Sequence, residues 1–221
     1  SPSISPQVSL TYGASKLAPL GVVFDASNTT APGITVHPFH ELLYSWNFGD
    51  NDTFTWTYGR DNTLKMNRAW GPIAGHTYKS PGTFTWTLTV TDGYISVSIS
   101  GTIVVADPDD ASSPYTGTNT VCVYNTVPGT TPAGANVVQS NPGDFDSIIS
   151  TYAGTNTRIL FKRGDSFTVS ATSNISVAGP MTIGAYETGA APAITVNASV
   201  SAIQFNNSNV SDIRVMDLAF T

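Results

Sequence analysis

The stretch Thr83-Phe-Thr-Trp-Thr-Leu-Thr-Val-Thr91 alternates a threonine with a large apolar residue. Because successive side chains of a β-strand point to opposite faces, the apolar residues share one face and the threonines share the other. The alternation therefore predicts a half-buried strand with a polar outer surface. Asp92-Gly93 follows at once, and this pair favours the tight turn of a β-hairpin.

The second arm of this hairpin is predicted over residues 94–106, which alternate in the same way around Gly101. Shorter strands are predicted upstream, each separated from the next by turn-forming residues. They cover residues 8–12, 20–24, 42–48 and 53–58. Several short strands over about 100 residues are typical of a β-sandwich. We therefore expect residues 1–107 to form a β-sandwich domain.

The composition supports an all-β chain. Among its 221 residues, 15 are acidic and 9 are basic, which gives a net charge of -6. This balance argues against a nucleic-acid partner, whose phosphates require a basic face. Only 11% of the residues are charged, and strand and turn formers take the place of helix formers. No apolar run approaches the length of about 20 residues that spans a bilayer.

The character of the chain changes near residues 107–114, an acidic stretch that contains Pro and Ser and has no apolar periodicity. Such a stretch predicts a linker, here residues 108–117. All four tryptophans and all three histidines precede it. Short apolar strands, split by Gly, Asn, Ser or Pro, are predicted in residues 118–221. They cover residues 158–161, 167–170, 175–177, 181–186, 193–196, 202–205 and 213–220.

These strands follow a repeat. Leu160, Ile183 and Gln204 recur at intervals of about 20 residues, and a period of this length with several short strands is typical of a solenoid. Before the first repeat, Asp144 or Asp146 is expected to cap a short helix. The apolar face of that helix would comprise Phe145, Ile148, Ile149 and Tyr152.

Four motifs identify the first domain. They are Val23-Phe-Asp-Ala-Ser27, Trp46-Asn-Phe-Gly-Asp50, His76-Thr-Tyr-Lys-Ser-Pro-Gly-Thr-Phe84 and Leu88-Thr-Val-Thr-Asp-Gly93. In this order they resemble the PKD domain family, over about residues 5–107. The second motif of that family usually has Asp where this chain has Asn47. The resemblance implies an immunoglobulin-like sandwich and a location outside the cell or on its surface.

The second domain resembles the N-terminal part of right-handed parallel β-helix proteins of the pectate-lyase-like kind. The residues that carry this resemblance are Phe161-Lys-Arg-Gly-Asp-Ser-Phe167 and the glycine-rich segment 183–194. In that family a small helix caps one end of the solenoid. Together, the two resemblances imply an immunoglobulin-like sandwich followed by a capped right-handed parallel β-helix of few rungs. Because that family normally has many more rungs, we expect the chain to be the N-terminal part of a larger modular protein.

Candidate binding residues lie within or near residues 51–75, the part that least resembles the PKD family. Trp56, Tyr58 and Trp70 are candidates for binding a carbohydrate or a protein partner. Aromatic faces that reach solvent stack on sugar rings and anchor protein interfaces. Packing in the core is the alternative for each of them.

The sequence offers one candidate cofactor, a calcium ion. Asp50, Asn51 and Asp52 form an oxygen-rich turn, and calcium prefers carboxylate and carbonyl oxygens. The alternative is that these residues simply form the turn, which Asp and Asn do commonly.

No complete catalytic constellation is found. Glycoside hydrolysis requires two carboxylates beside the scissile bond, whereas the acids after the linker occupy turns and the start of the helix. No histidine follows His76, which excludes a histidine-based triad in this part of the chain. We expect no catalytic residue within these 221 residues.

Three functions compete. We expect a non-catalytic module outside the cell, associated with adhesion or with carbohydrate, whose partner is a polysaccharide or another surface protein. The first alternative is a fragment of a polysaccharide lyase or glycoside hydrolase whose catalytic rungs lie beyond residue 221. The second is a structural subunit of a filament or spike that self-assembles through the open end of the β-helix.

Overall fold

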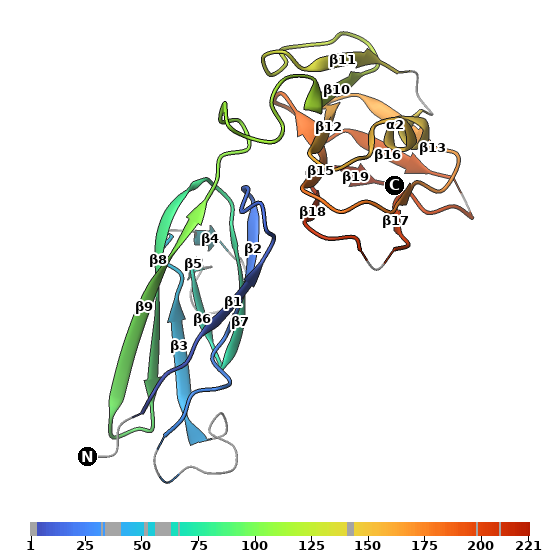
Figure 1. Ribbon diagram of the computed structural model, residues 1–221. Coiled ribbons are helices and arrows are strands. Elements are labelled where there is room, and N and C mark those ends of the chain that lie inside the picture. The colour runs from blue at the N-terminus through green and yellow to red at the C-terminus, as the bar shows by residue number, and fades with distance from the viewer. Residues whose placement is uncertain are drawn as a thin grey trace. The chain divides into compact units, whose positions relative to one another are not determined.

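The computed structural model describes residues 4–31, 33, 41–50, 53–55, 63–65, 67–140, 144–197, 199–207 and 209–221. β-strand is the main regular secondary structure of the described residues. The chain divides into two compact units, Ser1–Asp107 and Pro108–Thr221 (Figure 1).

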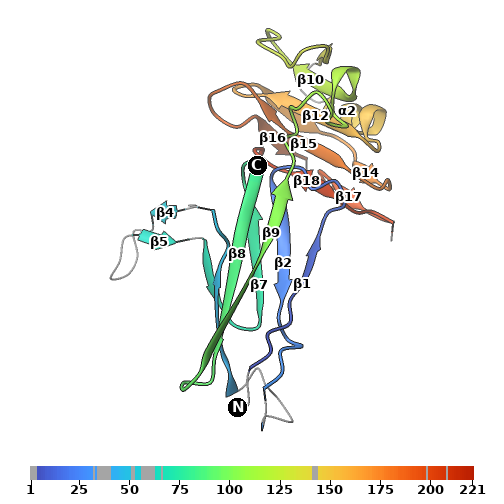
Figure 2. The ribbon, with the colours of Figure 1, turned by 60° about the vertical axis from the view of Figure 1, so that its left-hand side comes forward.

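The first unit is built from two antiparallel sheets. The first sheet has the order β1-β2-β7 and comprises β1 (Ser9–Tyr12), β2 (Leu20–Asp25) and β7 (Ile73–Tyr78). The second has the order β6-β3-β8-β9 and comprises β6 (Arg68–Trp70), β3 (Leu43–Asn47), β8 (Gly82–Thr91) and β9 (Ser96–Val105). A separate hairpin comprises β4 (Thr53–Thr55) and β5 (Thr63–Lys65). Figure 2 shows β8 and β9 running together as the longest hairpin of this unit.

The predicted hairpin and its polar outer face are confirmed. Trp86, Leu88 and Val90 are buried, whereas the threonines between them remain at least partly exposed. The core that these residues join is aromatic, because the ring of Phe24 lies 5.4 Å from the ring of Trp46, which is itself fully buried. Apolar burial between two sheets is the main stabilising contribution in such a sandwich.

The motif at 46–50 is held by contacts to both sheets. Tyr78 donates its hydroxyl hydrogen to the backbone oxygen of Phe48 at 2.8 Å. Gly49 has a φ of 82°, and a Cβ at this position would lie 2.0 Å from the backbone oxygen of Thr85. Only glycine fits such a close approach of two backbones.

The second unit is built from parallel sheets. The largest has the order β11-β10-β12-β15-β18 and comprises β11 (Asn136–Gln139), β10 (Thr120–Tyr124), β12 (Thr157–Lys162), β15 (Met181–Tyr186) and β18 (Ile213–Val215). The next comprises β13 (Ser166–Val169), β16 (Ala193–Val196) and β19 (Ala219–Phe220). The smallest comprises β14 (Asn174–Ile175) and β17 (Gln204–Phe205). A 3-10 turn, η1 (Gly117–Asn119), precedes β10.

From β12 onward, strands that follow one another along the chain lie in different sheets. β12, β13 and β14 supply one strand to each sheet, and β15, β16 and β17 repeat this order one position further along. β18 and β19 begin a third repetition. The chain thus returns to the same three sheets after each set of strands.

The predicted helix is confirmed as α2 (Phe145–Tyr152). Asp144 is its N-cap residue, although its side chain makes no capping hydrogen bond. Phe145, Ile148 and Ile149 are buried, and the ring of Phe145 stacks on the ring of Phe161 with their centroids 4.8 Å apart. The helix therefore joins the apolar core that the parallel sheets enclose.

The predicted repeat is wrong in its register. Ile183 pairs with Ile159 rather than with Leu160. Gln204 pairs with Asn174, which lies in a different sheet. Both Ile159 and Leu160 are buried on opposite faces of the strand, so the apolar pattern does not distinguish the two registers.

The predicted strand over 213–220 is also wrong, since it is two strands, β18 and β19. Asp217 lies between them with a φ of 60°, which turns the chain from one sheet into the next. Asp tolerates this left-handed backbone conformation better than most residues do.

Candidate functional site

The outer face of the sheet β6-β3-β8-β9 is covered mainly by small polar side chains. Residues directly opposite each other on antiparallel strands project to the same face, so the register defines rows of side chains. One row comprises Trp70, Ser45, Thr89 and Ser98. The next row comprises Arg68, Asn47, Thr87 and Ser100. With neighbouring strands about 4.8 Å apart, each row is about 14 Å long. We call these two rows the Trp70 face.

Trp70 is the one large aromatic residue of this face, and it is 75% exposed. Its neighbour Ala69 pairs with the fully buried Trp46. Alternation along the strand therefore places Trp70 on the outer surface. Trp46 donates its Nε1 hydrogen to the backbone oxygen of Gly71 at 2.8 Å, which anchors the chain directly after Trp70. The indole is thus presented from an anchored strand.

The remaining side chains of the Trp70 face offer hydrogen bonds. The hydroxyl oxygens of Thr89 and Ser98 lie 2.8 Å apart, and each serine or threonine hydroxyl can both donate and accept. Arg68 is the single charged side chain in the two rows. An exposed indole beside such groups can pack against the apolar face of a sugar ring while the hydroxyls exchange hydrogen bonds.

The sequence predicted Trp70 as a binding residue, and the structure places it at the surface. Trp56 and Tyr58 lie outside the described residues, so their roles stay predictions. Sequence reasoning missed Arg68, Asn47 and the hydroxyl residues of the two rows. The alternation of aromatic and polar residues in Tyr44-Ser-Trp-Asn47 was the available signal for Asn47.

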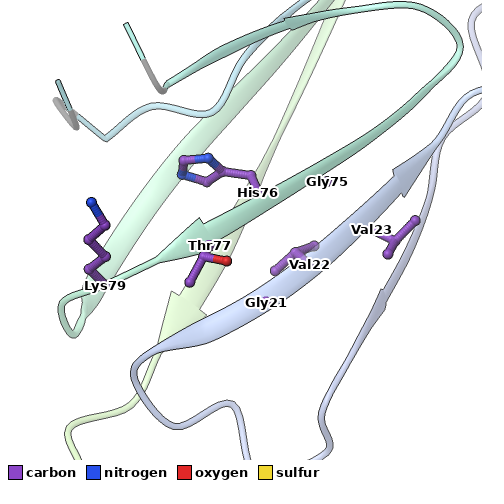
Figure 3. Close-up of a pocket in the computed structure, with 7 residues that line it drawn as sticks. All are labelled: Gly21, Val22, Val23, Gly75, His76, Thr77 and Lys79. Carbon is purple, nitrogen blue, oxygen red and sulfur yellow. The ribbon is translucent and has the colours of Figure 1, made fainter. Parts of the chain in front are cut away.

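A second surface feature is a shallow hollow of about 400 Å³ over β2 and β7 (Figure 3). It lies beside Gly21 and Gly75, where an added Cβ would meet no atom within 4 Å. His76 and Thr77 leave β7 in opposite directions in Figure 3, and His76 is buried. The hollow thus reflects missing side chains on an exposed sheet. It presents no nucleophile paired with a base, which acyl transfer would require.

The candidate calcium turn is described only at its first residue. Asp50 points toward the buried ring of His76, with 2.7 Å between Asp50 Oδ2 and His76 Nε2. Asn51 and Asp52 lie outside the described residues, so this site stays a prediction. Among the residues whose placement is described, no group of three or more His, Cys, Asp or Glu side chains is arranged to hold a metal ion.

Acidic side chains of the second unit form hydrogen bonds and ion pairs with nearby residues. Asp165 accepts hydrogen bonds from the backbone of Asn125 at 2.7 Å and from the hydroxyl of Thr126 at 3.2 Å. Glu187 accepts a hydrogen bond from the backbone of Thr130. Similar contacts involve Asp146 with the backbone of Ser170, Asp212 with Arg214, and Asp217 with Arg163. These contacts tie turns together and provide no facing pair of carboxylates for hydrolysis.

Cys122 is a core residue of the second unit. It is fully buried, and desolvation by burial raises the pKa of its thiol to about 11. The thiol therefore stays protonated at neutral pH and is a poor nucleophile.

The comparison with known families gives a match within the first unit. Residues 21–105 match the family model of the PKD domain. The resemblance of this region to PKD domains is thereby confirmed, and the first unit carries an immunoglobulin-like PKD domain. No curated protein matches the sequence. Within the part of the chain that is described, no helix is long and apolar enough to cross a membrane.

Proposed function

We propose that the chain is a non-catalytic module outside the cell that binds carbohydrate through the Trp70 face. One observation carries the proposal: Trp70 is 75% exposed on an anchored strand, in line with a row of hydroxyl side chains. An exposed tryptophan presents a large apolar ring face together with a polar N–H group, which suits it to stacking on a ligand. The PKD match supports the location, since PKD domains are typical of extracellular and surface proteins.

The charge of this face indicates which polysaccharides it suits. The protein carries a net charge of -6, yet Arg68 gives the Trp70 face a local positive charge. Hydroxyl and amide groups suit a neutral chain, and Arg68 additionally tolerates an acidic one. A strongly basic partner is therefore disfavoured at this site.

The test is a binding assay with the variant Trp70→Ala and a panel of cellulose, chitin, xylan and polygalacturonate. We expect the variant to lose about tenfold or more of the affinity for whichever polysaccharide the protein binds, as an aromatic anchor does when truncated. Tyr94→Ala is the matched control, because Tyr94 is 97% exposed but lies in the turn between β8 and β9. Equal affinity of Trp70→Ala and the native protein would reject the Trp70 face as the binding site.

A second candidate function concerns the second unit. We propose that it is the start of a right-handed parallel β-helix, with α2 as its cap, which continues by stacking. This is supported by the return of the chain to the same three sheets and by an apolar surface at the last strands. Phe205, Val215 and Phe220 are 51%, 41% and 45% exposed there and line a hollow of about 320 Å³. Either further rungs of a larger protein or another copy would cover this surface.

Light scattering distinguishes these two ways of covering the surface. If copies of this chain cover it, the native protein runs as an oligomer and Phe220→Asp reduces the mass to that of one chain. A native protein of single-chain mass that Phe220→Asp leaves unchanged would reject self-assembly. The remaining hypothesis of polysaccharide processing by a parent protein would then require paired acids in rungs that follow residue 221.

A further inference from the structure

A buried arginine lies on the outer face of the largest parallel sheet. Arg158 of β12 pairs with Thr120 of β10 and with Thr182 of β15. Its neighbour Ile159 belongs to the apolar core, so Arg158 projects to the opposite face of the sheet. The Arg158 side chain is only 9% exposed, which is rare for a charged group without a specific partner.

Several neighbours hold the guanidinium in place. Its Nε donates a hydrogen bond to Thr120 Oγ1 at 3.1 Å, and its Cζ lies 5.5 Å from the centre of the Tyr115 ring. Thr120 Oγ1 donates to the backbone oxygen of Tyr115 at 2.6 Å. The Tyr115 hydroxyl in turn lies 3.0 Å from the hydroxyl of Thr182. These contacts fix Arg158 independently of its anionic partner.

That anionic partner is Asp109, whose Oδ1 accepts a hydrogen bond from Arg158 Nη1 at 2.7 Å. The two side chains differ sharply in burial, since Asp109 is 67% exposed and Arg158 is 9% exposed. An ion pair adds little stability for a carboxylate that is already largely exposed to water. A buried guanidinium, by contrast, strongly favours having an anion beside it. The anion is therefore exchangeable, whereas the cation is fixed.

The pair opens onto a hollow of about 660 Å³, whose other walls include Tyr115, Thr116 and Pro132. A hollow of this volume lies within the range of small-molecule sites, about 300–1,000 Å³. The group that the guanidinium binds at this point is the planar carboxylate of Asp109. The fork of guanidinium hydrogens matches the geometry of carboxylates and of phosphates, and the group that occupies this position is a carboxylate.

We propose that this hollow binds a small organic carboxylate, which replaces Asp109 on Arg158. The carboxylate of the ligand takes the hydrogen bond from Nη1, and its body lies against Tyr115 and Pro132. Thr116 offers a further hydroxyl at the wall. This site belongs to the second unit alone, so it stands or falls separately from the Trp70 face.

The test is an NMR titration of the full chain with benzoate and with benzamide, its neutral counterpart of the same shape. The Nε–Hε resonance of Arg158 is the readout. We expect benzoate to shift it with a Kd of about 1 mM, the range of a ligand this small. Asp109→Asn removes the competing charge, and we expect it to bind benzoate about fivefold more tightly. Arg163→Gln is the control, since Arg163 also pairs with an aspartate, Asp217 at 2.9 Å, but is the more exposed arginine, at 21% against 9%.

Three results would overturn the proposal. The first is equal binding of benzamide and benzoate. The second is an Asp109→Asn variant that binds benzoate no more tightly than the native chain does. The third is inorganic phosphate binding more tightly than benzoate, which would assign the site to phosphate. Arg158→Gln should abolish binding while Arg163→Gln retains it; should Arg158→Gln fail to fold, the benzamide and Asp109→Asn comparisons decide the matter.

Discussion

We predict that the contact between Asp50 and His76 contributes to the stability of the first unit. The two side chains are 11% and 4% exposed, and their nearest atoms are 2.7 Å apart. Asp50→Ala leaves the His76 ring buried without this partner. An unsatisfied buried polar group costs about 1–3 kcal/mol, and breaking a buried pair costs about 3–5 kcal/mol.

The expected loss of stability lies in the upper part of the first range. Asp50 Oδ1 is buried without a hydrogen-bond partner, so removing the carboxylate also relieves one unfavourable burial. We therefore expect Asp50→Ala to lower the free energy of unfolding by about 2–3 kcal/mol. For a domain of about 100 residues this corresponds to a decrease in Tm of about 8–24 °C. Asp50→Asn retains an acceptor oxygen for His76 and should cost less than half as much.

Tryptophan fluorescence during urea unfolding is the assay. All four tryptophans precede residue 107, so their signal reports the first unit alone. Thr77→Ala is the control, because Thr77 is exposed on the other face of the same strand. A loss below about 1 kcal/mol for Asp50→Ala, equal to that of a surface substitution, would refute the reasoning.

Three further predictions concern burial and backbone strain. Iodoacetamide should label Cys122 at pH 8 only after unfolding, because the native thiol is buried. Burial also raises the pKa of this thiol from near 9.0 in the unfolded chain to about 11 in the native protein. The native state therefore holds the proton more tightly, and the second unit should lose stability as the pH rises between these two values. Gly49→Ala should destabilise the first unit by about 3 kcal/mol or more in the fluorescence assay, since it combines a positive φ with a clash against Thr85. Phe145→Ala should lower the stability of the second unit by about 3–5 kcal/mol, measured as labelling of Cys122 in urea, because it removes a fully buried ring that stacks on Phe161.

Each of these predictions has an opposing result. Labelling of Cys122 in the native chain at the rate of a free thiol would contradict its burial. Retention of the native urea midpoint in Gly49→Ala would contradict the close approach of the two backbones. For Phe145→Ala, a change in tryptophan fluorescence with no change in labelling would show that the ring does not belong to the core of the second unit.

The first unit could largely be predicted because one face of each long strand meets the core and the other meets water. The predicted strand at 94–106 agrees with β9 (Ser96–Val105) to within two residues at either end. β7 escaped prediction as a strand, since Gly75 and His76 interrupt the expected preference for β-branched residues. β6 escaped because it has only three residues.

The second unit was harder to predict because the central strands of its largest sheet, β10, β12 and β15, are buried on both faces. The strands at 181–186 and 193–196 were predicted with their observed bounds. The pairing of Ile159 with Ile183 was not, since Leu160 offers an equally apolar alternative. Hydrophobicity identifies such strands but does not fix their register.

The candidate site shows the same division. Trp70 is recognisable in the sequence because tryptophan is rare and large. Ser45 and Thr89 are not, because they belong to strands far apart in the sequence and become neighbours of Trp70 only through the sheet. Only the tertiary structure shows that they form one row.

The hairpin of β8 and β9 has a consequence for the order of folding. Its strands pair over their full length, and Asp92 Oδ1 accepts hydrogen bonds from the backbones of Tyr94 and Ile95 at the turn. A loop this short costs little entropy to close, and hairpins form in about 1–10 μs. β3 must instead search for β8 across a long intervening segment. We therefore expect the hairpin to form first and to serve as the template on which β3 aligns, so that changes at Asp92 slow folding.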